Sequence, residues 1–253
     1  MITAYHRPEK VDEALALLAR TDPNTRPLGG GTVLNQASDI DFEVVDLQAL
    51  GIDKLKTGNK TWKLGAALTL QNLLDAEGLP KALSRTIQHQ ATYNTRQVAT
   101  VAGTLVSADG RSAFTTAMLA LDAQLEIAKQ GTDVQQISIG DLLPLREELL
   151  NGALIVEVAF PAGVRLDYQY VARSPADLPI VCAAVALWPS GRTRVALGGY
   201  GSAPLLAMDG PTGAGAETAA LDAYREAGDS WASSEYRSEM ASKLISRCMK
   251  AVS

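Results

Sequence analysis

The stretch LGGGTVL, residues 28–34, places three consecutive glycines between a short apolar approach and a threonine. Glycine leaves the backbone N–H groups uncovered and Thr32 adds a hydroxyl, so this stretch can form a cradle for an anion such as a pyrophosphate. A run of glycine is also common in tight turns, and the stretch taken alone fits either structure. The segments around it decide between the two interpretations.

A second segment, ATVAGTLVSADG at residues 99–110, has similar chemistry. Gly103 and Thr104 again combine a glycine with a hydroxyl, beside an apolar run. Two such loops can lie on either side of one elongated ligand that carries phosphates. The pair therefore favours a cofactor site over a simple turn.

Helical and strand patterns alternate around these segments. Apolar residues recur at helical spacing in residues 11–20, which predicts an amphipathic helix. SAFTTAMLALDA, residues 112–123, is apolar almost all round, which predicts a helix in an interior layer. The other elements predicted in this part are strands at 43–47, 62–67 and 124–129, a helix at 72–76 capped by Thr69, and a helix at 80–92.

After Ala153 the sequence pattern changes from alternating helices and strands to a series of long strands. Long strands are predicted at residues 154–161, 165–173 and 192–201, with an apolar segment at 177–188 between the last two. The final helix is predicted at 233–252. Strands followed by helices predict a separate α+β module that begins near residues 162–166.

Composition limits the possible functions. The 253 residues, 47% of them hydrophobic, can build a substantial core. A net charge of −5 argues against a sequence-independent grip on nucleic acid, which needs a surplus of Lys and Arg. No run approaches the ~18 apolar residues of a membrane span, and the start, MITAYHRPEK, lacks a signal-peptide core. We therefore expect a cytoplasmic protein without nucleic-acid or membrane partners.

The common catalytic and metal-binding patterns do not occur in the sequence. Cys182 and Cys248 lie far apart and are expected to be buried thiols, and His6 and His89 have no neighbours at metal-ligand spacing. GxSxG, GxxxxGK[ST], HExxH and GxGxxG patterns are missing. No catalytic or metal-binding residue is predicted, and redox or other demanding chemistry would come from a cofactor.

The order of several segments resembles a known family. These segments are RPEKVDEALALL, LGGGTVL, TRQVATVAGTLVSADG, AMLALDAQLEI, ADLPIVCAAVAL and SSEYRSEMASKLISRCM. Together they resemble the FAD-binding medium subunit of the molybdenum hydroxylases, the carbon monoxide dehydrogenase and xanthine dehydrogenase type flavoproteins. The resemblance implies an α+β fold. A two-part FAD-binding domain like that of vanillyl-alcohol oxidase would span 1–161, with subdomains of about 1–50 and 51–161, and a carbon monoxide dehydrogenase flavoprotein C-terminal domain would span 162–253.

The resemblance also implies the cofactor site. In such proteins the first glycine loop wraps the FAD pyrophosphate with backbone amides, and the second loop adds amides and a hydroxyl from the other side. The positions carried over are Leu28, Gly29, Gly30, Gly31, Thr32, Val33, Leu34, Thr100, Gly103, Thr104 and Asp109. Asp109 would accept from a ligand hydroxyl or cap the helix that follows.

The chain departs from the family pattern at several positions. Ala102-Gly103 stands where Gly-Gly is common, residues 113–115 (AFT) replace an Asp-Leu-Pro, and Gln169 replaces a lysine. The segment after Asn35 is shorter than usual. These departures keep a flavin-free structural or assembly subunit open as the alternative, with a phosphate-binding domain unrelated to flavin as a third.

The resemblance implies a subunit of a larger oxidoreductase. A molybdopterin-containing large subunit would oxidise the substrate, a small subunit with two [2Fe–2S] clusters would conduct electrons, and FAD on this chain would pass them to an external acceptor. The chain is then expected in a hetero-oligomer. Tyr93, Tyr168 and Tyr170 either stack on the flavin or are ordinary core and strand residues. An apolar stripe on the last helix, Tyr236, Met240, Leu244 and Ile245, faces either a partner or its own sheet.

Overall fold

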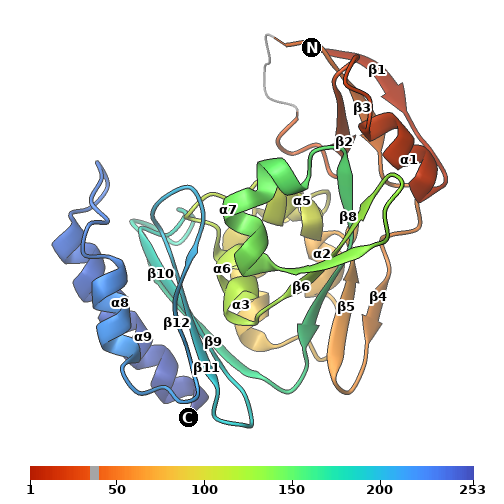
Figure 1. Cartoon of the computed structure of the whole chain (residues 1–253). Helices are drawn as coiled ribbons and strands as arrows, with labels where there is room; N and C mark the ends of the chain where they lie inside the picture. The colour runs from red at the N-terminus through yellow and green to blue at the C-terminus, as the bar shows by residue number, and fades with distance from the viewer. Residues whose placement is uncertain (35–39) are drawn as a thin grey trace. The chain divides into compact units, whose positions relative to one another are not determined.

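The computed structural model describes residues 1–34 and 40–253 (Figure 1). Their contacts form two compact units that are interleaved along the sequence. Unit 1 contains Met1–Asp75, Tyr93–Ser107 and Gln124–Ala159, and unit 2 contains Ala76–Thr92, Ala108–Ala123 and Phe160–Ser253. Each unit has its own sheets and its own core.

Unit 1 begins with a small parallel sheet of strand order β1–β3–β2. Its strands are β1 (Ile2–His6), β2 (Thr25–Leu28) and β3 (Phe42–Asp46). Helix α1 (Val11–Leu18) buries the apolar face that the sequence predicts, including Leu15 and Leu18, in one cluster with Val45. This sheet positions the glycine stretch, which directly follows β2.

A second sheet of unit 1 has the strand order β4–β5–β8–β6–β7. Its strands are β4 (Leu55–Thr57), β5 (Thr61–Gly65), β6 (Gln124–Lys129), β7 (Gln135–Ser138) and β8 (Ala153–Pro161). The helices of this part are α2 (Leu70–Leu74), α4 (Tyr93–Arg96), α5 (Val101–Val106) and α7 (Ile139–Leu149). Thr69 caps α2 as predicted, because its side chain accepts a hydrogen bond from the Asn72 N–H.

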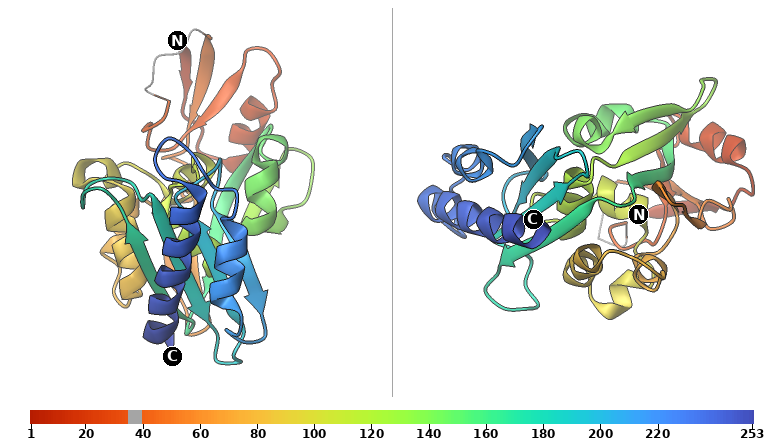
Figure 2. Two further views of the ribbon diagram at one scale, coloured as in Figure 1. Left: turned by 90° about the vertical axis from the view of Figure 1, so that its left-hand side faces the viewer. Right: turned by 90° about the horizontal axis from the view of Figure 1, so that it is seen from below.

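Unit 2 is an antiparallel sheet of order β12–β11–β10–β9 with helices on both faces (Figures 1 and 2). The strands are β9 (Arg165–Val171), β10 (Val181–Leu187), β11 (Thr193–Gly198) and β12 (Leu205–Gly210). Helices α8 (Ala216–Ala223) and α9 (Ser234–Val252) pack on one face, and α3 (Lys81–Gln90) and α6 (Ala113–Ala120) on the other.

Both faces of the central strand β10 are covered. Ala183 belongs to the apolar cluster shared with α8 and α9, whereas the Cys182 sulfur lies 3.7 Å from the Thr116 hydroxyl of α6. Because alternate residues of a strand point to opposite faces, β10 reads as a continuous apolar run. All eight residues of α6 are buried, which confirms the predicted interior helix.

The structure differs from the sequence interpretation of the elements at three points. Residues 100–104 are not a loop, because Thr100 caps α5 and the next four residues are helical. The sequence interpretation missed strand β12, which follows a turn and pairs with β11. The sequence interpretation also did not predict that Arg237 of α9 is fully buried, where its guanidinium donates to the carbonyls of Ile180 and Gly199. In the described part of the chain, no helix is long and apolar enough to span a lipid bilayer.

Candidate functional site

The glycine stretch turns sharply after β2, for reasons inside the protein. A Cβ on Gly30 would overlap the backbone carbonyl of Val98, and Gly31 has a φ of 68°, in the left-handed region that favours glycine. A Cβ on Gly29 would lie 2.8 Å from the Thr100 hydroxyl oxygen. The stretch is therefore a tight turn pressed against residues 98–100, so the two glycine-containing segments meet as the sequence predicts.

The backbone amides at the start of α5 are already satisfied. Val101 N–H donates to Leu68 O, and Ala102 N–H donates to Ala66 O. The Gly103 and Thr104 amides donate to the side chain and the carbonyl of Thr100. A helix start that packs on the strand-to-helix connection of α2 thus uses these amides internally, and the expectation that this segment supplies amides to a ligand stays a prediction.

The amides of the glycine turn differ from those of α5 in their hydrogen-bond partners. Among the residues that the structure describes, none accepts a hydrogen bond from the N–H groups of residues 29–32. The Thr100 hydroxyl accepts from Gly103 N–H at 3.1 Å and still has its own proton to donate. Gly29 and its two neighbours are half-buried, so they can offer these amides to a ligand without first breaking bonds within the protein.

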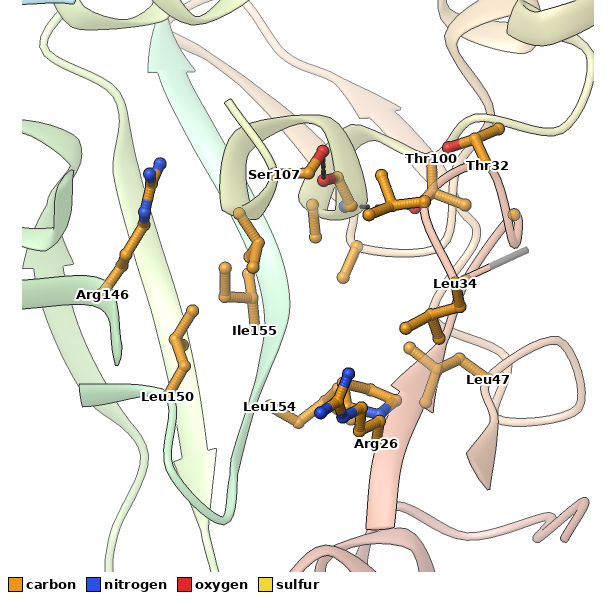
Figure 3. Close-up of a pocket in the computed structure, with 18 of the residues that line it drawn as sticks. Arg26, Thr32, Leu34, Leu47, Thr100, Ser107, Arg146, Leu150, Leu154 and Ile155 are labelled. Carbon is orange, nitrogen blue, oxygen red and sulfur yellow. Dashed lines mark hydrogen bonds between the residues drawn. The ribbon is translucent and has the colours of Figure 1, made fainter. Parts of the chain in front are cut away.

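These groups open on a cavity of about 570 Å³ within unit 1 (Figure 3). The size lies within the ~300–1,000 Å³ typical of cofactor sites. Its described lining residues are Arg26, Pro27, Gly29, Gly30, Gly31, Thr32, Val33, Leu34, Leu47, Ala66, Thr100, Ala102, Gly103, Val106, Ser107, Arg146, Glu147, Leu150, Asn151, Ala153, Leu154 and Ile155. Thr32 and Thr100 lie at one end, and Arg26 lies at the other.

The cavity brings together most of the predicted site residues. Residues 29–34, Thr100 and Gly103 all line it. Leu28, Thr104 and Asp109 are not among its described lining residues. The Thr104 hydroxyl donates to Thr100 O at 2.8 Å, and Asp109, in unit 2, accepts from the Arg111 N–H at 2.9 Å. Ser112, not Asp109, caps α6.

Two arginines of the cavity were missed by the sequence interpretation. Arg26 comes from β2 and Arg146 from α7, with Glu147 as the acidic residue among the described lining residues. Excess positive charge suits a phosphate-bearing ligand. Arg26 lies two residues before the predicted loop and could have been found there, whereas nothing in the sequence around Arg146 places it beside that loop.

The departures from the family pattern lie in different parts of the chain: Ala102-Gly103 lines the cavity of unit 1, whereas residues 113–115 and Gln169 belong to unit 2. Ala113 is the first residue of the buried helix α6, and Gln169 on β9 donates to the Asp167 carboxylate at 2.8 Å. Both are thus part of the packing of unit 2. The shortened segment after Asn35 falls mostly on residues 36–39, which lie outside the described residues.

The tyrosine candidates have ordinary structural surroundings. Tyr168 is 1% exposed, its hydroxyl lies 2.9 Å from His89 Nδ1, and burial raises its pKa well above the usual value. The ring of Tyr170 lies 3.9 Å from the His89 ring. Tyr93 is exposed, with the Arg96 guanidinium 5.3 Å from its ring centroid. Tyr168 is therefore a core residue of unit 2.

The cysteines and the apolar stripe of α9 are also part of the core. Cys182 and Cys248 are buried free thiols as predicted, and burial raises the pKa of Cys182 to about 11. Leu244 and Ile245 are buried in the cluster that α9 shares with the sheet. Tyr236, from the same stripe, is 41% exposed. The stripe thus packs on its own sheet over most of its length.

A glycine turn whose amides donate to none of the described residues, beside a cavity of this size, is typical of proteins that bind a phosphate-bearing cofactor. The comparisons with known proteins identify the family. A family model described as the FAD binding domain in molybdopterin dehydrogenase matches residues 1–163, more than half of the chain. The chain belongs to this family, and FAD is its cofactor.

The chain is similar to a curated protein in sequence and to solved structures in fold. The uncharacterized protein YgfM of Escherichia coli strain K12 is 29% identical over 211 residues, which cover 83% of this chain and 79% of YgfM. Two solved structures share the fold over 100% of this chain: quinoline 2-oxidoreductase from Pseudomonas putida 86 and a reconstituted CO dehydrogenase from Oligotropha carboxidovorans. Their TM-scores are 0.78 and 0.83, at 23% and 22% identity, and 97% and 98% of the respective chains are covered. The α+β fold class, an FAD-binding domain followed by a sheet with helices, is thus confirmed.

Proposed function

We propose that this chain is the FAD-binding electron-transfer subunit of a multi-subunit molybdenum hydroxylase. The observation that carries the proposal is the set of amides at Gly29 to Thr32, which donate to none of the described residues and belong to the lining of a cavity of cofactor size. The family match adds the cofactor and the class of enzyme. The residues fit FAD, since a pyrophosphate needs several N–H donors at close range.

The chain's own residues have distinct roles in this proposal. The amides of residues 29–32 hold the pyrophosphate, and the Thr100 hydroxyl donates from the neighbouring segment. Gly103 keeps the start of α5 free of a side chain, and Val33 and Leu34 continue the cavity wall. Bound FAD would supply the redox chemistry, taking electrons from [2Fe–2S] clusters of a partner subunit and delivering them to an external acceptor.

We further propose that the partners are a molybdopterin-containing large subunit and a [2Fe–2S] small subunit, assembled in the cytoplasm. The family description, which places this domain in molybdopterin dehydrogenases, supports the first partner. Co-expression with subunits encoded by neighbouring genes tests the assembly. We expect one complex on size exclusion, with flavin absorbance that is bleached when the substrate of the large subunit is added.

The FAD site is tested by the visible absorption spectrum of the full chain after incubation with FAD and desalting. A glycine substitution is a poor probe, because Gly30 and Gly31 have structural roles. Ala102, which lines the cavity in the first turn of α5, allows a charge test. Ala102→Asp and Ala102→Asn have side chains of the same shape, and an acid in the first helical turn favours folding.

We expect wild type and Ala102→Asn to retain the oxidised flavin spectrum. Ala102→Asp should bind FAD at least ~10-fold more weakly, because a carboxylate beside the pyrophosphate repels it. If Ala102→Asp and Ala102→Asn retain FAD equally well, the proposed position of the pyrophosphate beside α5 is wrong. Flavin missing from both the wild-type chain and the assembled complex would favour the second candidate, a flavin-free structural subunit, which the internally satisfied amides of α5 also favour.

A further inference from the structure

A tryptophan lies on the surface of unit 2, in the segment between α8 and α9. Trp231 is 45% exposed, and its indole N–H donates to none of the residues that the structure describes. Tryptophan is highly buried on average, so an exposed one in an ordered segment leaves a large apolar surface in contact with water. Such a surface is a candidate for contact with another molecule.

The backbone that carries Trp231 is anchored to the core of unit 2. The Asp229 carboxylate accepts from the N–H groups of Trp231 at 2.8 Å and Ala232 at 3.1 Å. Both oxygens of Asp229 also accept from Arg237, at 2.7 and 2.8 Å, and Arg237 is fully buried. The fold therefore sets the position of Trp231, and Arg237 matches the charge of Asp229.

Two arginines lie beside the exposed indole ring. The guanidinium carbons of Arg111 and Arg173 are 4.4 and 4.6 Å from the centroid of the Trp231 ring, within the ~6 Å of a cation–π contact. Arg111 is also held by the backbone, because its guanidinium donates to the carbonyls of Pro179 at 3.0 Å and Leu178 at 2.6 Å. The ring and the two cations thus form one cluster, built from segments far apart in sequence.

The two cations have no carboxylate partner. Neither Arg111 nor Arg173 forms an ion pair with a described residue, and Asp109 accepts from the backbone N–H of Arg111 at 2.9 Å. Leu178, whose carbonyl Arg111 binds, is 36% exposed. We call Arg111, Arg173, Leu178 and Trp231 the Trp231 patch. It presents cations, N–H donors and apolar surface, on a chain whose net charge is −5.

The chemistry of the patch selects the kind of molecule that fits it. Carboxylates supply the negative charge and the acceptor oxygens that unpaired guanidinium groups bind. Tryptophan and arginine are also the residue types enriched where proteins bind each other most tightly. An acidic protein surface that also carries apolar side chains therefore complements both the charge and the apolar part of the patch.

We propose that the Trp231 patch is a docking surface for a partner subunit that presents carboxylates beside apolar side chains. The proposal rests on the proposed function, which makes this chain one subunit of a larger oxidoreductase. The carboxylates pair with Arg111 and Arg173, and the indole ring of Trp231 packs on the apolar side chains. Because contacts within unit 2 already hold Trp231, docking loses little of its conformational freedom.

Binding of the full chain to the purified large and small subunits, encoded by neighbouring genes, tests this. Trp231→Ala removes the ring, and Arg173→Glu reverses one charge. Arg247→Glu is the matched control, because Arg247 is an exposed arginine of α9 that forms no ion pair with a described residue. Circular dichroism melts identify any variant that fails to fold.

Fluorescence gives a readout from the patch itself. The chain has three tryptophans, and the difference in emission between wild type and Trp231→Phe isolates Trp231 from Trp62 and Trp188. Emission is recorded with each subunit added and, separately, with inorganic phosphate added. Visible absorbance of the same samples records whether the chain carries flavin.

We expect Trp231→Ala and Arg173→Glu to weaken subunit binding by about tenfold or more, as is typical of hot-spot residues, and Arg247→Glu to leave it unchanged. Wild-type binding should weaken as salt is raised. The emission of Trp231 should shift to shorter wavelength when the partner subunit is added, because docking removes water from the indole.

Equal binding by folded Trp231→Ala, Arg173→Glu and Arg247→Glu would overturn the docking surface, and the proposed function would stand if the complex still forms with flavin. Emission of Trp231 that responds to inorganic phosphate but to neither subunit would overturn it in favour of a site for a small anion. A wild-type chain that retains FAD but binds neither subunit would overturn both the docking surface and the subunit assignment.

Discussion

Two different constraints, ligand approach and internal packing, both require a glycine at position 30. The sequence explains glycine by the need of a ligand to approach the backbone. The structure adds that the Val98 carbonyl already occupies the space where a Cβ would be, so the position excludes larger residues even without a cofactor. Loss of flavin in a Gly30 variant would therefore not separate a binding defect from a packing defect.

At the residue scale we predict that Gly30→Ala destabilises the chain in the absence of any flavin. The added Cβ must displace the backbone at Val98, and overpacking of this kind costs about 1–3 kcal/mol in the free energy of unfolding. Urea denaturation of the flavin-free protein measures it. Gly228→Ala is the control, because a Cβ there has its nearest neighbour at 3.5 Å. Equal stability of the two variants would show that the close approach at Gly30 is relieved without cost.

At the scale of elements, ion pairs join β11 and β12 to the turn after α6. Arg194 is 5% exposed and lies 2.9 Å from the Asp209 carboxylate and 2.8 Å from Asp122. Arg192 also donates to Asp209. Hydrogen bonds from Arg192, and the charges of Arg194 and Arg192, lower the pKa of Asp209 below its ordinary value of 3.8. The side-chain contacts between these two strands thus include an ionised carboxylate.

We predict a loss of stability in acid that depends on Asp209. A carboxyl whose pKa is lower in the folded state contributes fully above its ordinary pKa and loses that contribution as the pH falls through the lowered value. The melting temperature of wild type should therefore drop below about pH 4 more steeply than that of Asp209→Asn. The exposed Asp53→Asn should follow the wild-type profile. A parallel Asp209→Asn profile would contradict the prediction.

At the scale of the whole molecule, the two units are not consecutive pieces of the chain. Helices α3 and α6 come from the first two thirds of the sequence but pack on the sheet formed by β9 to β12. The division into domains 1–161 and 162–253 stays a prediction. The family model ends close to it, at residue 163, whereas the contacts group the chain differently.

We predict that a fragment of residues 1–161 does not fold as the intact chain does. It would expose α6, whose eight residues are all buried, because the strands that cover it lie after residue 164. Apolar surface of this kind favours aggregation. Size exclusion and thermal melting of the fragment, beside the full chain, measure the effect. A soluble monomer with a cooperative melt would instead establish residues 1–161 as an independent domain.

The sequence predicted the local elements well where periodicity was strong. The amphipathic helix α1, the interior helix α6, the Thr69 cap and the final helix all depend on residues within one or two turns of each other, so their signals are local. The strand β12 was missed, because apolar and polar residues do not alternate clearly along it. Its position is set by pairing with β11.

The sequence by itself indicated the family and the segment predicted to hold the cofactor, because six motifs in order and three adjacent glycines are properties of the chain alone. Only the tertiary structure decided which amides remain available. Thr100 and its helix sit against residues 66–68, which use the amides of α5, while those of the glycine turn donate to no described residue. It also decided that Arg26 lies beside Phe42 and lines the cavity. Hydrogen-bond partners and cavity walls come from residues far apart in sequence, and local patterns do not encode which of them meet.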